Sequence, residues 1–251
     1  MENQVSEPEQ RPSEWDQAVR LFASRGLLLC LTLFLIEIGI FFAVTSAPYF
    51  PGEQALYSGE AHQLGNQVSN STNSQLLVQI FTNNYRIALI EMIPVIGVVL
   101  FAVSIYATAR VTKAIAGIDG VPAVLVVLLL LVIFPHSLLE LSAYAVATAE
   151  GLYFLYAIIK WLGGNRARLN REWGQLAINL VLVTIILAVA AVFETVEIAL
   201  GDYFWIMWVP FIGVVVGVVR LNRRLSKVRK GEAGKTVASP TRPVVTEQGP
   251  P

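Results

Sequence analysis

The sequence predicts an all-α, polytopic helical membrane protein with about six transmembrane helices. Hydrophobic residues make up 55% of its 251 residues and charged residues 14%, whereas a soluble domain has about a quarter charged residues. The mean hydropathy is +0.61. Several apolar runs reach the length of about 20 residues that crossing a hydrocarbon core about 30 Å thick requires. Composition and run length therefore indicate the same fold class.

The chain divides into three parts. Residues 1–20 are polar and are predicted to form a cytoplasmic N-terminal segment. Residues 21–220 form the predicted six-span transmembrane domain. Residues 221–251 begin with a basic stretch and continue with Pro, Thr and Val, so we expect a largely disordered cytoplasmic tail.

The first predicted span covers residues 26–47, and the outer loop 48–80 that follows contains no Lys or Arg. The remaining spans are predicted at residues 87–109, 121–134, 137–159, 175–196 and 204–219. The third and fourth of these form a short hairpin with Pro135 and His136 at its tip. The arm 121–134 is short for a full crossing, so it either crosses incompletely or re-enters.

The distribution of basic residues predicts the orientation of the spans. Cytoplasmic segments carry an excess of Lys and Arg. With both termini cytoplasmic, all but one of the 18 Lys and Arg residues lie inside, and Arg86 alone lies outside. This arrangement places Arg110 and Lys113 inside, so the central hairpin must go out and come back. We therefore expect a multi-pass protein of the cell membrane.

Charged and polar residues within the spans indicate a network in the outer leaflet. A carboxylate in a membrane span is costly, so each one needs a partner, a proton or a function. Glu37 and Glu150 are two such carboxylates. The predicted network comprises seven residues at similar depth: Asn83, Asn84, Arg86, Glu91, His136, Glu140 and Glu194. We expect Arg86 to pair with Glu140. The network is either a buried set of ion pairs that fixes helix register or a polar site open to the outside.

Catalytic and metal chemistry find little support in the sequence. His136 and Glu140 are four residues apart and face the same way, as metal ligands can, but the only other histidine is His62 in the outer loop. His136 and Ser137 are neighbours that are not expected to hydrogen-bond as base and nucleophile. No glycine-rich nucleotide motif is present. We therefore expect no catalytic residues, no metal, no cofactor and no enzymatic activity.

A stripe of small residues marks the fourth span as a packing helix. Ala143, Ala147 and Gly151 recur every four residues, a spacing that lets another helix approach closely. Glu140 lies on the same face, which favours contact with protein rather than lipid. The neighbouring helix belongs either to this chain or to a second copy in a homo-oligomer.

Two ordered segments resemble the stage II sporulation protein M family of membrane proteins. Residues 80–89, IFTNNYRIAL, are similar to that family's F-x-N-N-x-R-x-A-L opening. Residues 134–143, FPHSLLELSA, followed by Gly151, are similar to its P-H-G-x-x-E-L-x-A segment with a later glycine. The resemblance covers roughly residues 20–220. Ser137 stands where the family usually has glycine.

The resemblance implies a polytopic, non-catalytic scaffold that organises partner proteins at the membrane. The expected partners are the lipid bilayer and membrane or extracytoplasmic proteins, without nucleic acid. The alternative is a permease or transporter subunit with an outer-leaflet carboxylate site. The intramembrane carboxylates, the short arm 121–134 and the prolines Pro94 and Pro210 favour this alternative, because broken helices line the binding sites of many transporters.

Overall fold

The computed structural model describes residues 25–118, 133–164, 166–217 and 219–220, together with positions 122, 125, 128 and 131. The predicted segments 1–20 and 221–251, and most of the arm 121–134, lie outside the described residues. Two units are distinguished, one ending at Met207 and one beginning at Trp208. In the second unit, residues 208–217 are helical.

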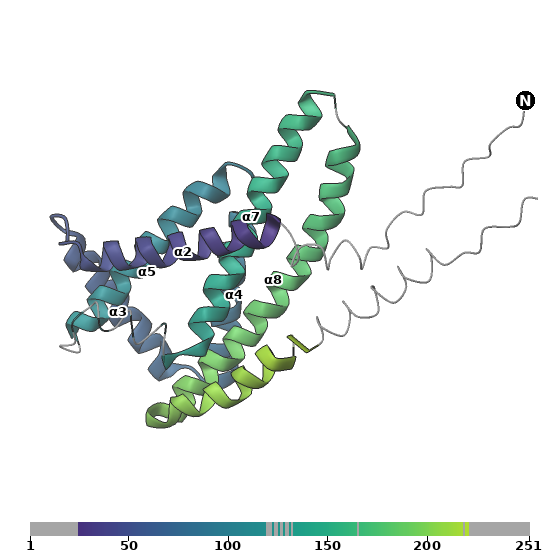
Figure 1. The fold of residues 1–251 in the computed structure, drawn as a ribbon. Helices are drawn as coiled ribbons and strands as arrows, with labels where there is room; N and C mark the ends of the chain where they lie inside the picture. The colour runs from purple at the N-terminus through teal and green to yellow at the C-terminus, as the bar shows by residue number, and fades with distance from the viewer. Residues whose placement is uncertain are drawn as a thin grey trace, which may run out of the picture. The chain divides into compact units, whose positions relative to one another are not determined.

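Helices make up all the regular structure of the described residues, which contain no strand. In chain order the elements are α2 (Arg25–Ser46), α3 (Glu53–Asn70), α4 (Asn73–Glu91), α5 (Ile96–Ile118), α7 (Pro135–Leu162), α8 (Arg166–Leu200) and the 3-10 helix η1 (Gly201–Met207) (Figure 1). The predicted all-α class is confirmed.

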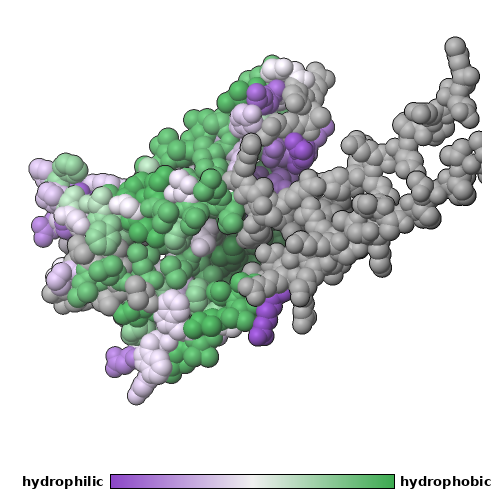
Figure 2. Space-filling model, viewed as in Figure 1, coloured by the Kyte–Doolittle hydropathy of each residue, from purple (hydrophilic) through white to green (hydrophobic). Residues whose placement is uncertain are grey.

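Four helical stretches of the described residues are long and apolar enough to cross a membrane. They are Gly26–Ser46, Ile96–Gly117, Pro135–Leu162 and Leu169–Gly217. The last stretch contains η1, which begins at Gly201, between the fifth and sixth predicted spans. Figure 2 shows hydrophobic residues over most of the visible face of these helices, as expected for surfaces in contact with lipid.

The first and fourth predicted spans correspond to α2 and α7. Helix α7 begins at Pro135, which occupies its first turn after the extended residue Phe134. Proline suits this position because its missing N–H would have no partner inside the helix. The Pro-His tip predicted from the sequence is thus the N-terminus of a helix that continues to Leu162.

The second predicted span is wrong, because the chain breaks in its middle. Helix α4 ends at Glu91 and α5 begins at Ile96, with Pro94 between them and Val95 at a positive φ of 69°. Proline disfavours helical backbone at the residue before it and removes one backbone donor. Residues 87–109 are therefore the end of one helix and the start of another.

The predicted outer loop 48–80 also turns out to be mostly helical. Gly52, at φ 85°, provides the turn that precedes α3. The Glu53 carboxylate accepts a hydrogen bond of 2.9 Å from the Phe50 N–H, which fixes the start of the helix. Helix α4 then starts with a capping box between Thr72 and Gln75. The polar composition of this segment reflects exposed helices rather than irregular structure.

Arg110 joins the end of α2 to α3 and α5. Its guanidinium donates hydrogen bonds to the carbonyls of Val44, Ala47 and Pro48, at 3.2, 3.0 and 3.1 Å. These carbonyls lie at the C-terminal end of α2, where helix carbonyls lack intrahelical partners and attract cations. Lys113 donates to the Ala47 carbonyl as well.

These contacts correct the predicted placement of two basic residues. Arg110 and Lys113 were expected on the opposite side of the membrane from Pro48, but both lie at the same end of the helices as Pro48. The distribution of basic residues along the sequence could not predict this, because it does not show which Lys and Arg side chains bind helix carbonyls.

Helices α4 and α5 form a hairpin that packs against α7. Asn84 contacts Glu140 and Glu91 contacts Thr148, so α4 and α7 run in the same direction. Two glycines allow the turn to pack tightly. A Cβ atom added at Gly97 would lie 1.9 Å from the carbonyl oxygen of Glu91, and one added at Gly151 would lie 2.8 Å from the same oxygen.

Helix α7 occupies the centre of the first unit, where α2, α4, α5 and α8 all pack against it. Hydrogen bonds from His136 to Glu197 and from Asn179 to Glu150 show that α7 and α8 are antiparallel. One apolar cluster joins α4, α7 and α8 through Ala88, Met92, Ala143, Ala147, Val183 and Leu187. A second joins α2, α5 and α7 through Leu33, Phe101, Ile105, Ala145 and Ala149.

Candidate functional site

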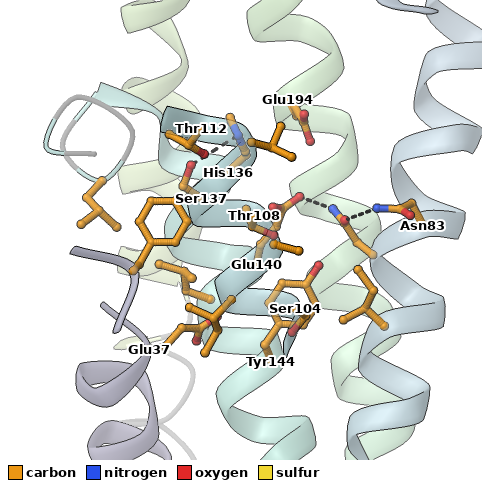
Figure 3. Close-up of a pocket in the computed structure, with 18 of the residues that line it drawn as sticks. Glu37, Asn83, Ser104, Thr108, Thr112, His136, Ser137, Glu140, Tyr144 and Glu194 are labelled. Carbon is orange, nitrogen blue, oxygen red and sulfur yellow. Dashed lines mark hydrogen bonds between the residues drawn. The ribbon is translucent and has the colours of Figure 1, made fainter. Parts of the chain in front are cut away.

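A cavity of about 570 Å³ lies where α2, α3, α4, α5, α7 and α8 meet. Its wall is mixed: Ile38, Phe41 and Ile105 are among its apolar residues. Its polar residues are Glu37, Glu60, Asn83, Asn84, Ser104, Thr108, Thr112, His136, Ser137, Glu140, Tyr144 and Glu194, most of which Figure 3 labels. We take this cavity as the candidate functional site, because convergent polar groups in a concave apolar wall are typical of binding sites.

Carboxylates dominate the charge of the cavity wall. Glu37, Glu60, Glu140 and Glu194 line it, and no Lys or Arg is among the lining residues. Glu60 is exposed on α3, whereas Glu37 on α2 is only 2% exposed. Acidic groups therefore extend from an exposed side chain on α3 to a buried side chain on α2, and the field inside the cavity favours cations.

Glu140 is the polar centre of the α7 wall. The Asn84 side chain donates a hydrogen bond to its carboxylate, and Asn83 donates to the Asn84 carbonyl oxygen at 3.4 Å (Figure 3). Glu194 of α8 lies beside Glu140. The Asn-Asn pair of the first family-like segment thus meets the glutamate of the second. Their similar predicted depth placed these residues in one network, although depth could not predict the hydrogen bond.

His136 is held at the cavity by Glu197. Its Nδ1 is hydrogen-bonded to the Glu197 carboxylate, and its Nε2 lies 3.4 Å from the Ser137 hydroxyl oxygen. The two side chains are thus in hydrogen-bonding contact, whereas the prediction concerned only a base and nucleophile pair. Neighbouring residues can make this contact because the first turn of α7 brings the two side chains together (Figure 3). The distance exceeds the 2.6–3.2 Å or so that proton transfer in catalysis favours.

The expected ion pair between Arg86 and Glu140 does not form among the described residues. The Arg86 side chain is exposed, and Glu140 is bound by Asn84 instead. Asn84 precedes Arg86 by two residues and so faces a different side of α4, which the predicted depth could not distinguish.

Glu91 does not line the cavity itself but is hydrogen-bonded to Ser104, which does. Its carboxylate accepts hydrogen bonds from Ser104 at 3.0 Å and from Thr148 at 3.4 Å. It therefore links α4, α5 and α7 next to the Gly97 and Gly151 contacts. Of the seven residues predicted as a network, the cavity brings together Asn83, Asn84, His136, Glu140 and Glu194.

The small-residue stripe lies against neighbouring helices of the same chain. Ala143 and Ala147 are fully buried in the cluster with α4 and α8, and Gly151 faces the end of α4. Within the described part of the chain, no group of three or more His, Cys, Asp or Glu residues could hold a metal ion.

Glu37 is a buried carboxylate of the cavity that the predicted network omitted. It was recognised as an intramembrane carboxylate, but its depth in the first span gave no sign that it faces Glu140. Its buried Oε2 atom has no hydrogen-bond partner in the structure. The signal available in the sequence was the position of a lone glutamate in an otherwise apolar span.

Glu53 lies outside the membrane-spanning helices and forms the charged partner of Arg110. The Tyr106 hydroxyl donates a hydrogen bond to its carboxylate, and the Arg110 guanidinium lies 3.3 Å away. The Tyr106 hydrogen bond first, then that of the Phe50 N–H and the Arg110 charge, lower the pKa of Glu53 against the raising effect of burial. The carboxylate is thereby kept ionised.

A comparison with known families agrees with the resemblance of the two segments. The model of the family described as "Stage II sporulation protein M" matches residues 30–196, more than half of the chain. The match contains α3, α4, α5 and α7, together with most of α2 and α8. No curated protein and no solved structure matches the chain.

Proposed function

Because the chain belongs to the stage II sporulation protein M family, we propose that it is an integral membrane scaffold that organises partner proteins at the cell membrane. It acts without catalysis of its own. The observation that carries this proposal is α3, a polar helix outside the spans that the Arg110 contacts tie to α2 and α5.

Helix α3 has the exposure that a docking element needs. Residues 62–70 are all exposed, and Ala61 is its only buried residue. Its far end is tied to α4, because Gln67 donates a hydrogen bond of 2.9 Å to Gln79. A helix anchored at both ends presents its surface in a fixed orientation, which lowers the ordering cost of binding a partner.

The orientation in the membrane follows from the remaining basic residues. Arg25 is the first residue of α2, and Lys160 through Arg171 surround the connection between α7 and α8. These segments and both termini are cytoplasmic by the excess of Lys and Arg. Arg110 and Lys113 are the exception, since helix carbonyls bind them. Helix α3 consequently faces the outside.

Photocrosslinking in native membranes tests the scaffold role. A photoreactive residue at Gln63, exposed on α3, is expected to form adducts with discrete proteins that are absent without illumination. The matched control is Val99, which is 60% exposed within a candidate membrane span and should contact lipid. Failure of Gln63 and its exposed neighbours on α3 to crosslink any protein would refute the proposal.

A second candidate function, a permease or transporter subunit, is favoured by the carboxylate-lined cavity. Flux in proteoliposomes tests it directly. If the cavity is part of a solute pathway, the full chain supports uptake that Glu140→Gln abolishes and that Arg86→Ala, at an exposed site outside the cavity, leaves unchanged. Absence of flux for cationic solutes would remove this candidate and leave the scaffold role untouched.

A further inference from the structure

We propose that the cavity binds an aliphatic amine whose ammonium group pairs with the Glu37 carboxylate. Glu37 lines the cavity from α2 and is 2% exposed. Its Oε2 is buried and has no hydrogen-bond partner among the residues that the structure describes. A charged group without a partner is among the least favourable in a membrane span, so a cation that enters the cavity gains a buried counter-charge there.

Among the described residues, no lysine or arginine supplies a cation to the cavity. No Lys or Arg is among the lining residues. The two basic residues of α5 bind the end of α2: Arg110 bonds three carbonyls and Glu53, and Lys113 bonds Ala47. His136, which does line the cavity, is engaged by Glu197. No described residue therefore supplies a counter-charge to Glu37, and a cationic ligand would supply one.

The other carboxylates of the wall are occupied or more accessible than Glu37. Asn84 hydrogen-bonds Glu140, and Glu194 lies beside Glu140. Glu60 is exposed on α3. An acidic residue at an exposed wall raises the local concentration of cations, so a ligand would meet Glu60 before it reaches Glu37.

The size and composition of the cavity favour an organic amine over a bare metal ion. About 570 Å³ falls within the 300–1,000 Å³ or so typical of small-molecule sites. Among the described residues no cluster could hold a metal ion. Ile38, Phe41 and Ile105 provide apolar wall for a hydrocarbon chain. The Tyr144 ring adds an aromatic surface, which attracts ammonium groups.

This inference is independent of the scaffold proposal, because it needs neither a protein partner nor transport. The full-length protein in detergent is titrated by calorimetry with spermidine, an aliphatic triamine. 1,8-Octanediol, a neutral chain of comparable length, serves as the matched probe. We expect saturable binding of spermidine and at least about tenfold weaker binding of the diol, because only the amine neutralises Glu37.

Two variants assign the binding to the cavity. Glu37→Gln is expected to weaken spermidine binding at least about tenfold. Glu150→Gln should leave it unchanged, because Glu150 is equally buried but contacts Asn179 outside the cavity. Ala107→Phe, which fills the cavity from α5, should abolish binding and stands in if Glu37→Gln does not fold.

Three results would overturn the inference. These are no saturable binding of spermidine to the folded wild type, equal binding of spermidine and the diol, and spermidine affinity that survives Glu37→Gln or Ala107→Phe. If neither variant folds, the comparison of spermidine and diol binding to the wild type still tests the inference. A failed titration would not affect the crosslinking test of the scaffold role.

Discussion

The Arg110 guanidinium lies 3.3 Å from the Glu53 carboxylate and joins two helices that are separated in sequence by all of α4. Arg110 is 1% exposed. Its other donors are used by carbonyls at the end of α2. One buried side chain thus holds the end of α2, the start of α3 and the last turns of α5 together, which makes it the anchor of the exposed helix.

Arg110→Ala should destabilise the protein strongly. The change removes a donor from three carbonyls at the end of α2 and from the Glu53 carboxylate, and each buried acceptor left without a partner costs about 1–3 kcal/mol. Thermal unfolding in detergent measures the effect. Arg86→Ala is the matched control, since Arg86 is exposed, and it should change stability by less than about 0.5 kcal/mol. Equal effects of the two variants would contradict the role of Arg110.

The Glu53 carboxylate makes the stability of the protein fall with pH in the acidic range. Its pKa is lowered from 4.5, chiefly by the Tyr106 hydrogen bond. A group whose folded pKa is depressed adds stability that is present above 4.5 and is lost as the pH falls through the lower, folded value. The difference in melting temperature between wild type and Glu53→Gln should therefore shrink below pH 4.5. A difference that stays constant from pH 7 to 3 would contradict this.

Replacing either glycine next to Glu91 should disrupt the α4–α5 turn. In Gly97→Ala and Gly151→Ala the new Cβ would lie 1.9 and 2.8 Å from the Glu91 carbonyl oxygen, so backbone must move. Overpacking of this kind costs about 1–3 kcal/mol. Gly39→Ala is the control, because nothing lies within 4 Å of its Cβ position. Melting temperatures of the three variants should fall only for the first two.

Asn84 and its neighbour Asn83 offer a matched pair for the cavity wall. Asn84→Ala removes the donor to Glu140 and should cost about 1–3 kcal/mol. Asn83 is exposed, so Asn83→Ala should change stability by less than about 0.5 kcal/mol. Thermal unfolding of both variants decides the point. A larger loss for Asn83→Ala would mean that Asn84 does not hold Glu140.

The sequence predicted the fold class and the long helices because their signal is local. Composition and run length locate α2 and α7 to within a few residues, and Pro135 marks the start of α7. The predicted depth of the spans placed Asn83, Asn84, His136 and Glu140 in one network, and the cavity contains all four residues. Depth follows from the bounds of the apolar runs, which are a local property of the sequence.

The errors arose where long-range contacts override local patterns. The break at Pro94 lies inside an apolar run that hydropathy treats as continuous. Arg110 resembles the flanking charge of a span, and only the fold reveals that it binds the end of α2. Glu37 lies on a span whose orientation about its own axis the sequence does not encode. Each error concerns which side of a helix meets which neighbour.

The α4–α5 hairpin predicts that α3 and the C-terminal end of α5 lie on the same side of the membrane. In a Cys30→Ser background, single cysteines at Gln63 and Gly117 can be labelled in intact cells with a membrane-impermeant maleimide. Both positions are exposed. We predict that both cysteines label from outside before lysis. Labelling of Gly117→Cys only after lysis, with Gln63→Cys labelled before it, would contradict the hairpin.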